Sequence, residues 1–349
     1  MRISNRGSKI IYYLTCLISA IVELGSVFWG IKYGFGIGGI LGLALAYQLG
    51  NVFRFFVGKK MAHYQDFILC GVTLISVVLL FLDKTSTIGY TLAFIMFFVF
   101  SIFLQNVRSS AQGDIPRWQK RSCRVIGFVL SALMYLFGDL LMLAINLIVL
   151  ISSCLLDKYD YDKWIYNLKR GVFGHRICWA MVTHQAHYFA YTYIMFFLVM
   201  KHFENPFIST LWFAANWVPY TITEPLVQKL RWNKWYVIAI GAHIFNAIVL
   251  VGMYLTVDVS ITFALLLWVL TGFGGGNVFC IKKALAENIK YDKNVWNFSE
   301  QLGHILGVVV SIIVVLVNFD LKVSMLVGAG FALVTAPIIT YFTKCKKVK

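Results

Sequence analysis

The sequence has few charged residues and no nucleotide-binding motif. Only 13% of its 349 residues are Asp, Glu, Lys or Arg, whereas 60% are hydrophobic and the mean hydropathy is +0.76. A soluble domain carries about 25% charged and about 45–50% apolar residues, and a water-soluble chain of this length could not bury so many apolar side chains. The absence of a G-x-x-x-x-G-K-[ST] sequence argues against a nucleotide-driven pump.

The cysteines and the net charge exclude two further classes. Seven cysteines are scattered without a C-x-x-C or a Cys/His cluster, so we predict neither a disulfide framework nor a zinc site, and no cofactor. A formal net charge of +16 would suggest nucleic-acid binding in a soluble protein. Here the basic residues lie in the gaps between apolar runs. We therefore interpret them as signals of membrane topology and expect no nucleic-acid partner.

Long apolar runs dominate the chain. Runs of roughly 20 residues can each cross a bilayer, and hydropathy predicts twelve such spans: 10–31, 36–57, 63–82, 88–107, 122–138, 140–156, 173–200, 206–226, 235–256, 260–281, 296–317 and 321–342. The run 125–156 is interrupted only by Gly138 and Asp139. It could form one long helix or a tight hairpin of two short ones.

The positions of Lys and Arg decide between these alternatives. With twelve spans and the N-terminus inside, 27 of the 31 basic residues lie on the cytoplasmic side; the exceptions are Lys32, Lys84, Lys201 and Lys322. The basic gaps 108–124 and after 156 both belong inside, so an even number of spans separates them, which favours the hairpin. We expect an all-α polytopic protein of the cytoplasmic (inner or plasma) membrane, with both termini cytoplasmic and a monomeric state.

The spans divide into two six-helix bundles, 1–156 and 173–349, joined by a cytoplasmic linker at 157–172. Two parallel halves are typical of secondary transporters. Gly50 lies near the end of the second span, and Gly58-Lys59-Lys60 follows that span. This organisation resembles the major facilitator superfamily over nearly the whole chain, and these residues resemble its G-x-x-x-D-[RK]-x-G-[RK]-[RK] motif, with Arg54 in place of the Asp. The resemblance implies a cytoplasmic latch, of which Arg54, Lys59 and Lys60 supply the basic half.

Polar side chains within the first two spans are candidate binding groups. An ionisable residue at membrane depth is costly and is a functional hypothesis by default. Glu23 shares a helical face with Ser19, so we expect it to bind a proton or the solute; a structural ion pair or an interfacial position is the alternative. One face of the second span carries Tyr47, Gln48, Asn51 and Arg54. Arg54 could hold an anionic solute, pair with Glu23 or extend to the cytoplasmic boundary.

The second half has its own polar face. The spacing i, i+3, i+4, i+7 on the seventh span places imidazole and phenol groups together: His184, His187, Tyr188 and Tyr191. We expect them to line a cavity, with a possible proton relay, and favour packing and metal binding less. Two neutral histidines without a nearby Asp, Glu or Cys make a poor metal site. Asn216 lies on a polar face of the eighth span, whereas His243 and Asn246 are assigned to packing.

Three residues are expected to act as a gate or as contacts between the halves. They are Glu224, Glu300 and His304, and the last two can form an i, i+4 pair. Solute binding is an equal alternative for Glu300 and His304, and Glu224 could instead cap its helix or pair with Lys229.

The function predicted is secondary active transport by alternating access. The solute would be a small polar or amphipathic organic molecule, moved with proton coupling, and export of a metabolite is one form this could take. A non-transporting receptor or scaffold on a transporter fold is the first alternative. A membrane-embedded enzyme acting on a lipid-linked substrate is the second, although it would need paired carboxylates or a metal cluster beside a sizeable polar loop.

Overall fold

A computed structural model describes residues 5–57, 59–111, 116–156, 178–229, 234–276, 278–286 and 293–344. Every regular element among these residues is helical. The chain forms two compact units, Met1–Arg170 and Gly171–Lys349, which are described separately. The linker predicted at 157–172 lies outside the described residues, as do the two ends of the chain.

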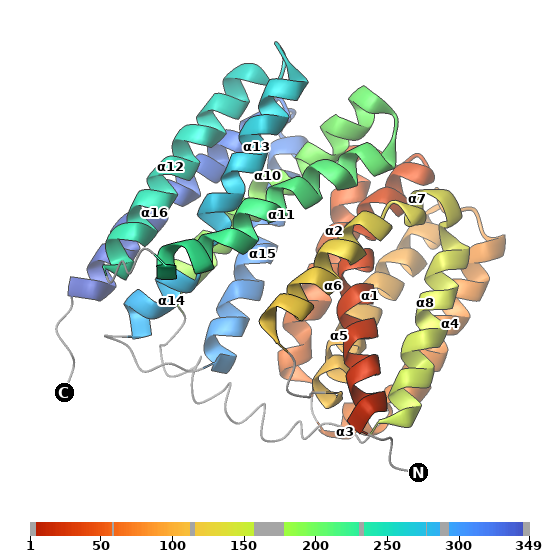
Figure 1. The fold of residues 1–349 in the computed structure, drawn as a ribbon. Coiled ribbons are helices and arrows are strands. Elements are labelled where there is room, and N and C mark those ends of the chain that lie inside the picture. The colour runs from red at the N-terminus through yellow and green to blue at the C-terminus, as the bar shows by residue number, and fades with distance from the viewer. Residues whose placement is uncertain are drawn as a thin grey trace. The chain divides into compact units, whose positions relative to one another are not determined.

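The first unit contains helices of unequal length (Figure 1). Its elements are α1 (Asn5–Lys32), α2 (Ile37–Phe53), the 3₁₀ helix η1 (Arg54–Phe56), α3 (Lys59–His63), α4 (Gln65–Phe81), α5 (Thr87–Ser110), α6 (Arg117–Leu130), α7 (Leu133–Phe137) and α8 (Asp139–Leu155). Helix α1 is central, because it packs against α2, α5, α6 and α7. Its polar face is therefore enclosed by neighbouring helices.

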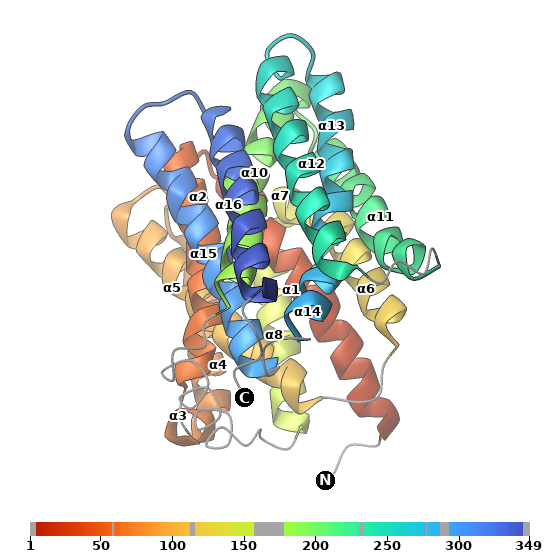
Figure 2. The ribbon, with the colours of Figure 1, turned by 90° about the vertical axis from the view of Figure 1, so that its left-hand side faces the viewer.

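The second unit is built around α10. Its elements are α10 (Trp179–Phe203), α11 (Pro206–Lys229), α12 (Trp235–Thr256), α13 (Ile261–Gly276), α14 (Val278–Ala286), α15 (Lys293–Leu316) and α16 (Val323–Lys344). Figure 2 shows α16 beside α10 and α12, and it packs on both. Helix α10 also packs on α15 and α11.

The outer faces of these helices are apolar, as a bilayer requires. Helix α4 exposes Phe67, Leu74 and Phe81, which are spaced seven residues apart, while it buries Leu69 and Leu79 on the other side. In the described part of the chain, seven helices are long and apolar enough to cross a membrane. The protein is therefore an all-α, multi-pass membrane protein, while the count of twelve spans stays a prediction.

The run 125–156 is broken, as the charge pattern predicts. Helix α6 ends at Leu130, the short α7 follows, and Gly138 adopts a left-handed φ of 50° before α8 begins at Asp139. A Cβ at Gly138 would lie 2.6 Å from the Tyr33 hydroxyl, so the turn needs glycine for both conformation and space. Figure 1 shows the chain rising through α6 and descending through α8. A single long helix is excluded.

The basic gap 108–124 differs from the sequence interpretation. Helix α5 extends to Ser110 and includes Arg108, while α6 already begins at Arg117 and includes Arg124. The expected loop is therefore much shorter, and its basic residues are largely helical. Arg124 enters the unit because it has an acidic partner there.

Candidate functional sites in the two units

An ion pair with a buried acid and a partly exposed base joins α1 to α6 in the first unit. The Glu23 carboxylate of α1 accepts a hydrogen bond from a terminal nitrogen of Arg124 on α6, at 2.9 Å. Glu23 is 8% exposed. The sequence prediction singled out Glu23 and suggested Arg54 as a possible partner, but the partner is Arg124, which had been assigned to a cytoplasmic loop.

The predicted polar residues of the first two spans gather beside this pair. The Tyr47 hydroxyl lies 3.0 Å from Ser19 Oγ and donates to the Ser19 carbonyl at 3.0 Å. On the same face of α2, the Asn51 amide donates to Gln48 Oε1 at 3.4 Å, and Gln48 also interacts with Glu23. All four of these side chains are buried. The structure thus brings the predicted residues of α1 and α2 into one cluster, here called the Glu23 cluster.

Gln105 of α5 joins the Glu23 cluster and was missed by the sequence analysis. Its Nε2 lies 3.4 Å from Ser19 Oγ, and its Oε1 accepts from Arg54 Nη1 at 3.2 Å. The same oxygen accepts a hydrogen bond from Arg108. Two guanidinium groups therefore converge on one neutral amide oxygen. Arg54 is held inside the unit by this contact.

Among the described residues, cationic groups outnumber anionic groups at the Glu23 cluster. Arg54, Arg108 and Arg124 contribute three positive charges, and Glu23 contributes one negative charge. The other acids described in this unit are engaged elsewhere: Asp66 accepts from Ser153, Asp83 accepts from Thr85, and Asp139 binds Lys84. This arrangement favours an anionic ligand.

Asp139 forms a second polar centre at the start of α8. Its carboxylate accepts from Trp29 Nε1 and from the Tyr33 hydroxyl, both at 2.8 Å, and pairs with Lys84 at 2.9 Å. Burial and the Asp139 carboxylate raise the pKa of Tyr33, which lies just beyond the end of α1. These contacts join α1, the α4–α5 loop and α8. Asp139 was noted in the sequence only as an interruption between spans.

In the second unit, Tyr188 and Asn216 meet as a hydrogen-bonded pair. The Tyr188 hydroxyl donates to Asn216 Oδ1 at 2.9 Å, and Asn216 Nδ2 lies 2.9 Å from Thr271 Oγ1 and 2.5 Å from the Trp268 carbonyl. These bonds join α10, α11 and α13. Tyr191, one turn further along α10, is fully buried.

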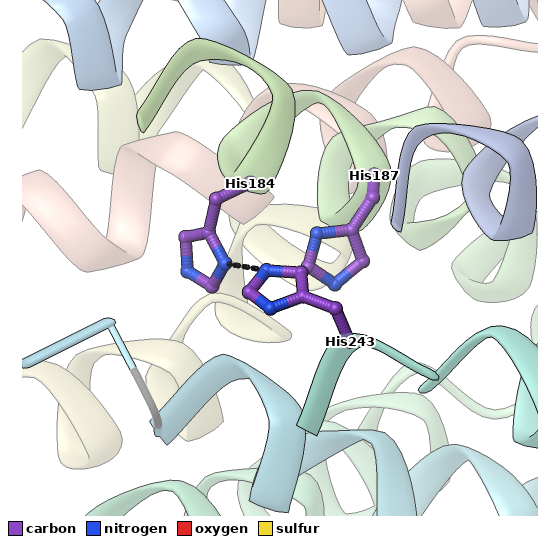
Figure 3. Close-up of side chains that lie close together, drawn as sticks. All are labelled: His184, His187 and His243. Carbon is purple, nitrogen blue, oxygen red and sulfur yellow. Dashed lines mark hydrogen bonds between the residues drawn. The ribbon is translucent and has the colours of Figure 1, made fainter. Parts of the chain in front are cut away.

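Three histidines converge in the same unit (Figure 3). His184 and His187 come from α10 and His243 from α12; their exposed fractions are 3%, 0% and 1%. His184 Nδ1 lies 2.9 Å from His243 Nε2, and His187 Nε2 lies 3.0 Å from the Asn246 amide nitrogen. His243 and Asn246 of α12, which the sequence interpretation left to packing, thus contact the predicted polar face of α10. No local signal in the sequence links them to it.

The predicted gating residues are found in separate contacts. Glu300 pairs with Lys282 at 2.5 Å, and His304 lies 3.2 Å from Gln185 Oε1. The suggested Glu300–His304 pair stays a prediction. Glu224 accepts from Gln228 at 3.4 Å. The side chains of Lys59 and Lys60 lie outside the described residues. The latch and gate roles stay predictions.

Comparison with solved structures identifies the architecture. The nucleoside transporter NupG aligns with 98% of this chain and 99% of its own, with a TM-score of 0.67 and 16% identity. The fold is that of the major facilitator superfamily. The POT family transporter PepTSo aligns over 98% of both chains with a TM-score of 0.64 and 10% identity. No family model and no curated protein matches the sequence.

The same major facilitator fold occurs in a bacterial homologue of the iron transporter ferroportin. Its outward-facing structure aligns with 99% of this chain and 100% of its own (TM-score 0.58, 11% identity), and its inward-facing structure with 96% and 99% (TM-score 0.60, 13% identity). At these identities the comparison establishes the fold alone. It leaves solute and coupling to be argued from the residues.

Proposed function

We propose that this protein is a secondary transporter that moves a small organic anion across the cytoplasmic membrane by alternating access, with proton coupling through Glu23. Both termini would be cytoplasmic and the working unit a monomer. The observation that carries the proposal is the Glu23–Arg124 ion pair inside a unit of a transporter fold. Ionisable groups within membrane-spanning helices are expensive and mark ion or solute pathways.

The ion pair supports a link between proton and solute. The Glu23 carboxylate and a solute anion can compete for the Arg124 guanidinium, because either one can accept charge-assisted hydrogen bonds from it. When Glu23 takes up a proton, it loses the charge that holds Arg124 and the solute can replace it. When the solute leaves, the ion pair reforms and the proton is released. This exchange couples the two without any further group.

The charge surplus of the Glu23 cluster supports an anionic solute. Arg54 and Arg108 both donate to the neutral oxygen of Gln105, which brings two like charges close together. A carboxylate or phosphate group in place of that oxygen would neutralise one of them and could bind a guanidinium through two parallel hydrogen bonds. The neighbouring Tyr47 and Gln48 would then contact the polar remainder of the solute.

Flux in reconstituted liposomes tests this function and separates it from the receptor and enzyme alternatives. A panel of small carboxylates and phosphate monoesters, each with a neutral amide or alcohol analogue, is added outside liposomes that contain a pH-sensitive dye. We expect one or more anions, and none of the neutral analogues, to move protons. Glu23→Gln should abolish proton movement but retain exchange of a labelled anion across the membrane.

The matched control is Glu204→Gln, which removes an exposed acid at the end of α10. It should leave both fluxes unchanged. Proton movement that persists in Glu23→Gln at the wild-type rate would overturn the coupling role. Solute-specific stabilisation without flux in any liposome would favour a receptor instead.

A further inference from the structure

The cluster of His184, His187 and His243 has the composition and geometry of a metal site. Three imidazoles from two helices each offer one ring nitrogen, and these atoms lie within 4.8 Å of one another (Figure 3). We propose that the second unit binds one divalent transition-metal ion of the Zn²⁺ class through these three histidines, bracing α10 against α12. The site is independent of the transported solute proposed above.

The hydrogen bonds of His243 orient it as a ligand. Its Nδ1 lies 2.6 Å from the Ala239 carbonyl, which can only accept, so Nδ1 carries the proton and Nε2 presents a lone pair. Histidines that bind metals usually donate the other ring N–H to a carbonyl in this way. The His243 lone pair faces His184 Nδ1 at 2.9 Å. Without metal, His184 must donate a proton there.

Metal binding needs a change of tautomer at His184 and small movements of the three rings. Moving the His184 proton from Nδ1 to Nε2 leaves two lone pairs facing each other, which a cation between them stabilises. Ring nitrogens bind Zn²⁺ at about 2.0–2.1 Å, which puts tetrahedral ligands about 3.3 Å apart. The 2.9 Å pair must therefore open slightly, and the widest separation must shorten from at most 4.8 Å.

His187 and Asn246 supply a second, independent observation. His187 is 0% exposed and interacts with the His184 backbone, whereas Asn246 Oδ1 has no hydrogen-bond partner within the described residues. Buried polar atoms without partners are costly. Exchanging the oxygen and nitrogen of the Asn246 amide would let Oδ1 accept from His187 Nε2–H. His187 would give up its hydrogen bond with the His184 backbone, and its Nδ1 would present a lone pair to the metal.

The surroundings tolerate such an ion. Imidazole ligands suit Zn²⁺, Cu²⁺ and Ni²⁺, and three histidines leave a fourth position for water or an anion. Lys282, which acts electrostatically on His184, is neutralised by Glu300 at 2.5 Å. Gly274 of α13 lies directly against the Asn246 side chain, where a Cβ would clash with it. Asn246 is thereby held beside His187.

Direct titration with Co²⁺ and Zn²⁺ tests the site. The full-length protein is purified through a tag without histidine, stripped with chelator and titrated with Co²⁺, whose visible absorption reports four-coordinate binding. We expect one equivalent of Co²⁺ to bind, Zn²⁺ to displace it, and Zn²⁺ to raise the melting temperature. His243→Gln should weaken binding about 100-fold, since one of three protein ligands is lost.

Two variants separate a metal site from histidine packing. His202→Gln removes an exposed histidine from the same helix and should leave the affinity unchanged. Asn246→Asp keeps the side-chain volume and gives His187 a carboxylate partner, so it should tighten binding about 10-fold. Because Asn246→Asp is expected to gain affinity for the metal, it tests the metal site even if His243→Gln fails to fold. The proposal is overturned by the absence of saturable 1:1 binding, or by equal affinities in wild type and Asn246→Asp. Neither result bears on solute flux.

Discussion

Replacing Asp139 with Ala should be among the most destabilising single changes in the first unit. The change removes the acceptor of two 2.8 Å hydrogen bonds, from Trp29 and Tyr33, and the partner of Lys84. Breaking a buried ion pair costs about 3–5 kcal/mol because it leaves an uncompensated charge. The Lys84 side chain is 13% exposed, so water screens part of this penalty. The fully buried Trp29 indole loses its acceptor as well, at about 1–3 kcal/mol.

We therefore expect Asp139→Ala to lower the free energy of unfolding by about 4 kcal/mol. At about 2–4 °C per kcal/mol this corresponds to a fall of roughly 10 °C in melting temperature. Asp139→Asn keeps an oxygen that can accept from Trp29, so it should lower the free energy of unfolding by about half as much as Asp139→Ala. Tryptophan fluorescence during thermal unfolding in detergent measures both shifts.

Two comparisons show whether the mechanism is the one described. Asp83→Ala removes an exposed acid from the α4–α5 loop and should leave the melting temperature near that of wild type. Adding Lys84→Met to Asp139→Ala removes the uncompensated charge and should restore about 1 kcal/mol or more. A melting temperature of Asp139→Ala equal to that of Asp83→Ala would refute the reasoning, as would a double variant less stable than Asp139→Ala alone.

Three further changes follow from the same contacts. Because the pKa of Tyr33 is raised in the folded protein, its contribution to folding stability is complete below about pH 10, the ordinary pKa of tyrosine, and declines at higher pH. Tyr33→Phe should therefore reduce the fall in melting temperature between pH 9 and 11. Gly274→Ala should destabilise the protein, by thermal unfolding, because its methyl group would displace Asn246. Arg124→Gln should cost about 2 kcal/mol, below the fully buried value, since Arg124 is 37% exposed; Glu23→Gln added to it should restore part of that stability.

The spans could be predicted because a bilayer imposes a simple rule on composition. A helix such as α12, Trp235–Thr256, begins and ends at the residues that hydropathy gives. The break before Asp139 was also predictable, since the Lys and Arg residues on either side constrain the number of crossings. The exact position of the break within 131–138 was harder to predict from the sequence. It depends on where Gly138 can adopt a left-handed turn beside Tyr33.

The residues of the candidate sites were predictable only along single helices. Periodicity placed Glu23 with Ser19, and His184 with His187, because neighbours at i+3 and i+4 share a helical face. Their partners come from distant helices: Arg124 is 101 residues from Glu23, and His243 is 59 residues from His184. The basic composition of 108–124 made Arg124 resemble a topology signal. A charge that orients a helix and one that neutralises a buried acid have the same sequence signature.

The two units hold their ionisable groups in different chemical states, and this difference bears on the proposed coupling. Glu23 is ion-paired, so gain of a proton changes the charge presented to Arg124. The histidines of the second unit are bonded to one another, to a carbonyl and to an amide, with no carboxylate in the cluster. Loss of one histidine should therefore alter metal affinity and stability, whereas Glu23→Gln should alter proton flux. A histidine substitution that abolished proton flux while retaining anion exchange would place the coupling group in the second unit instead.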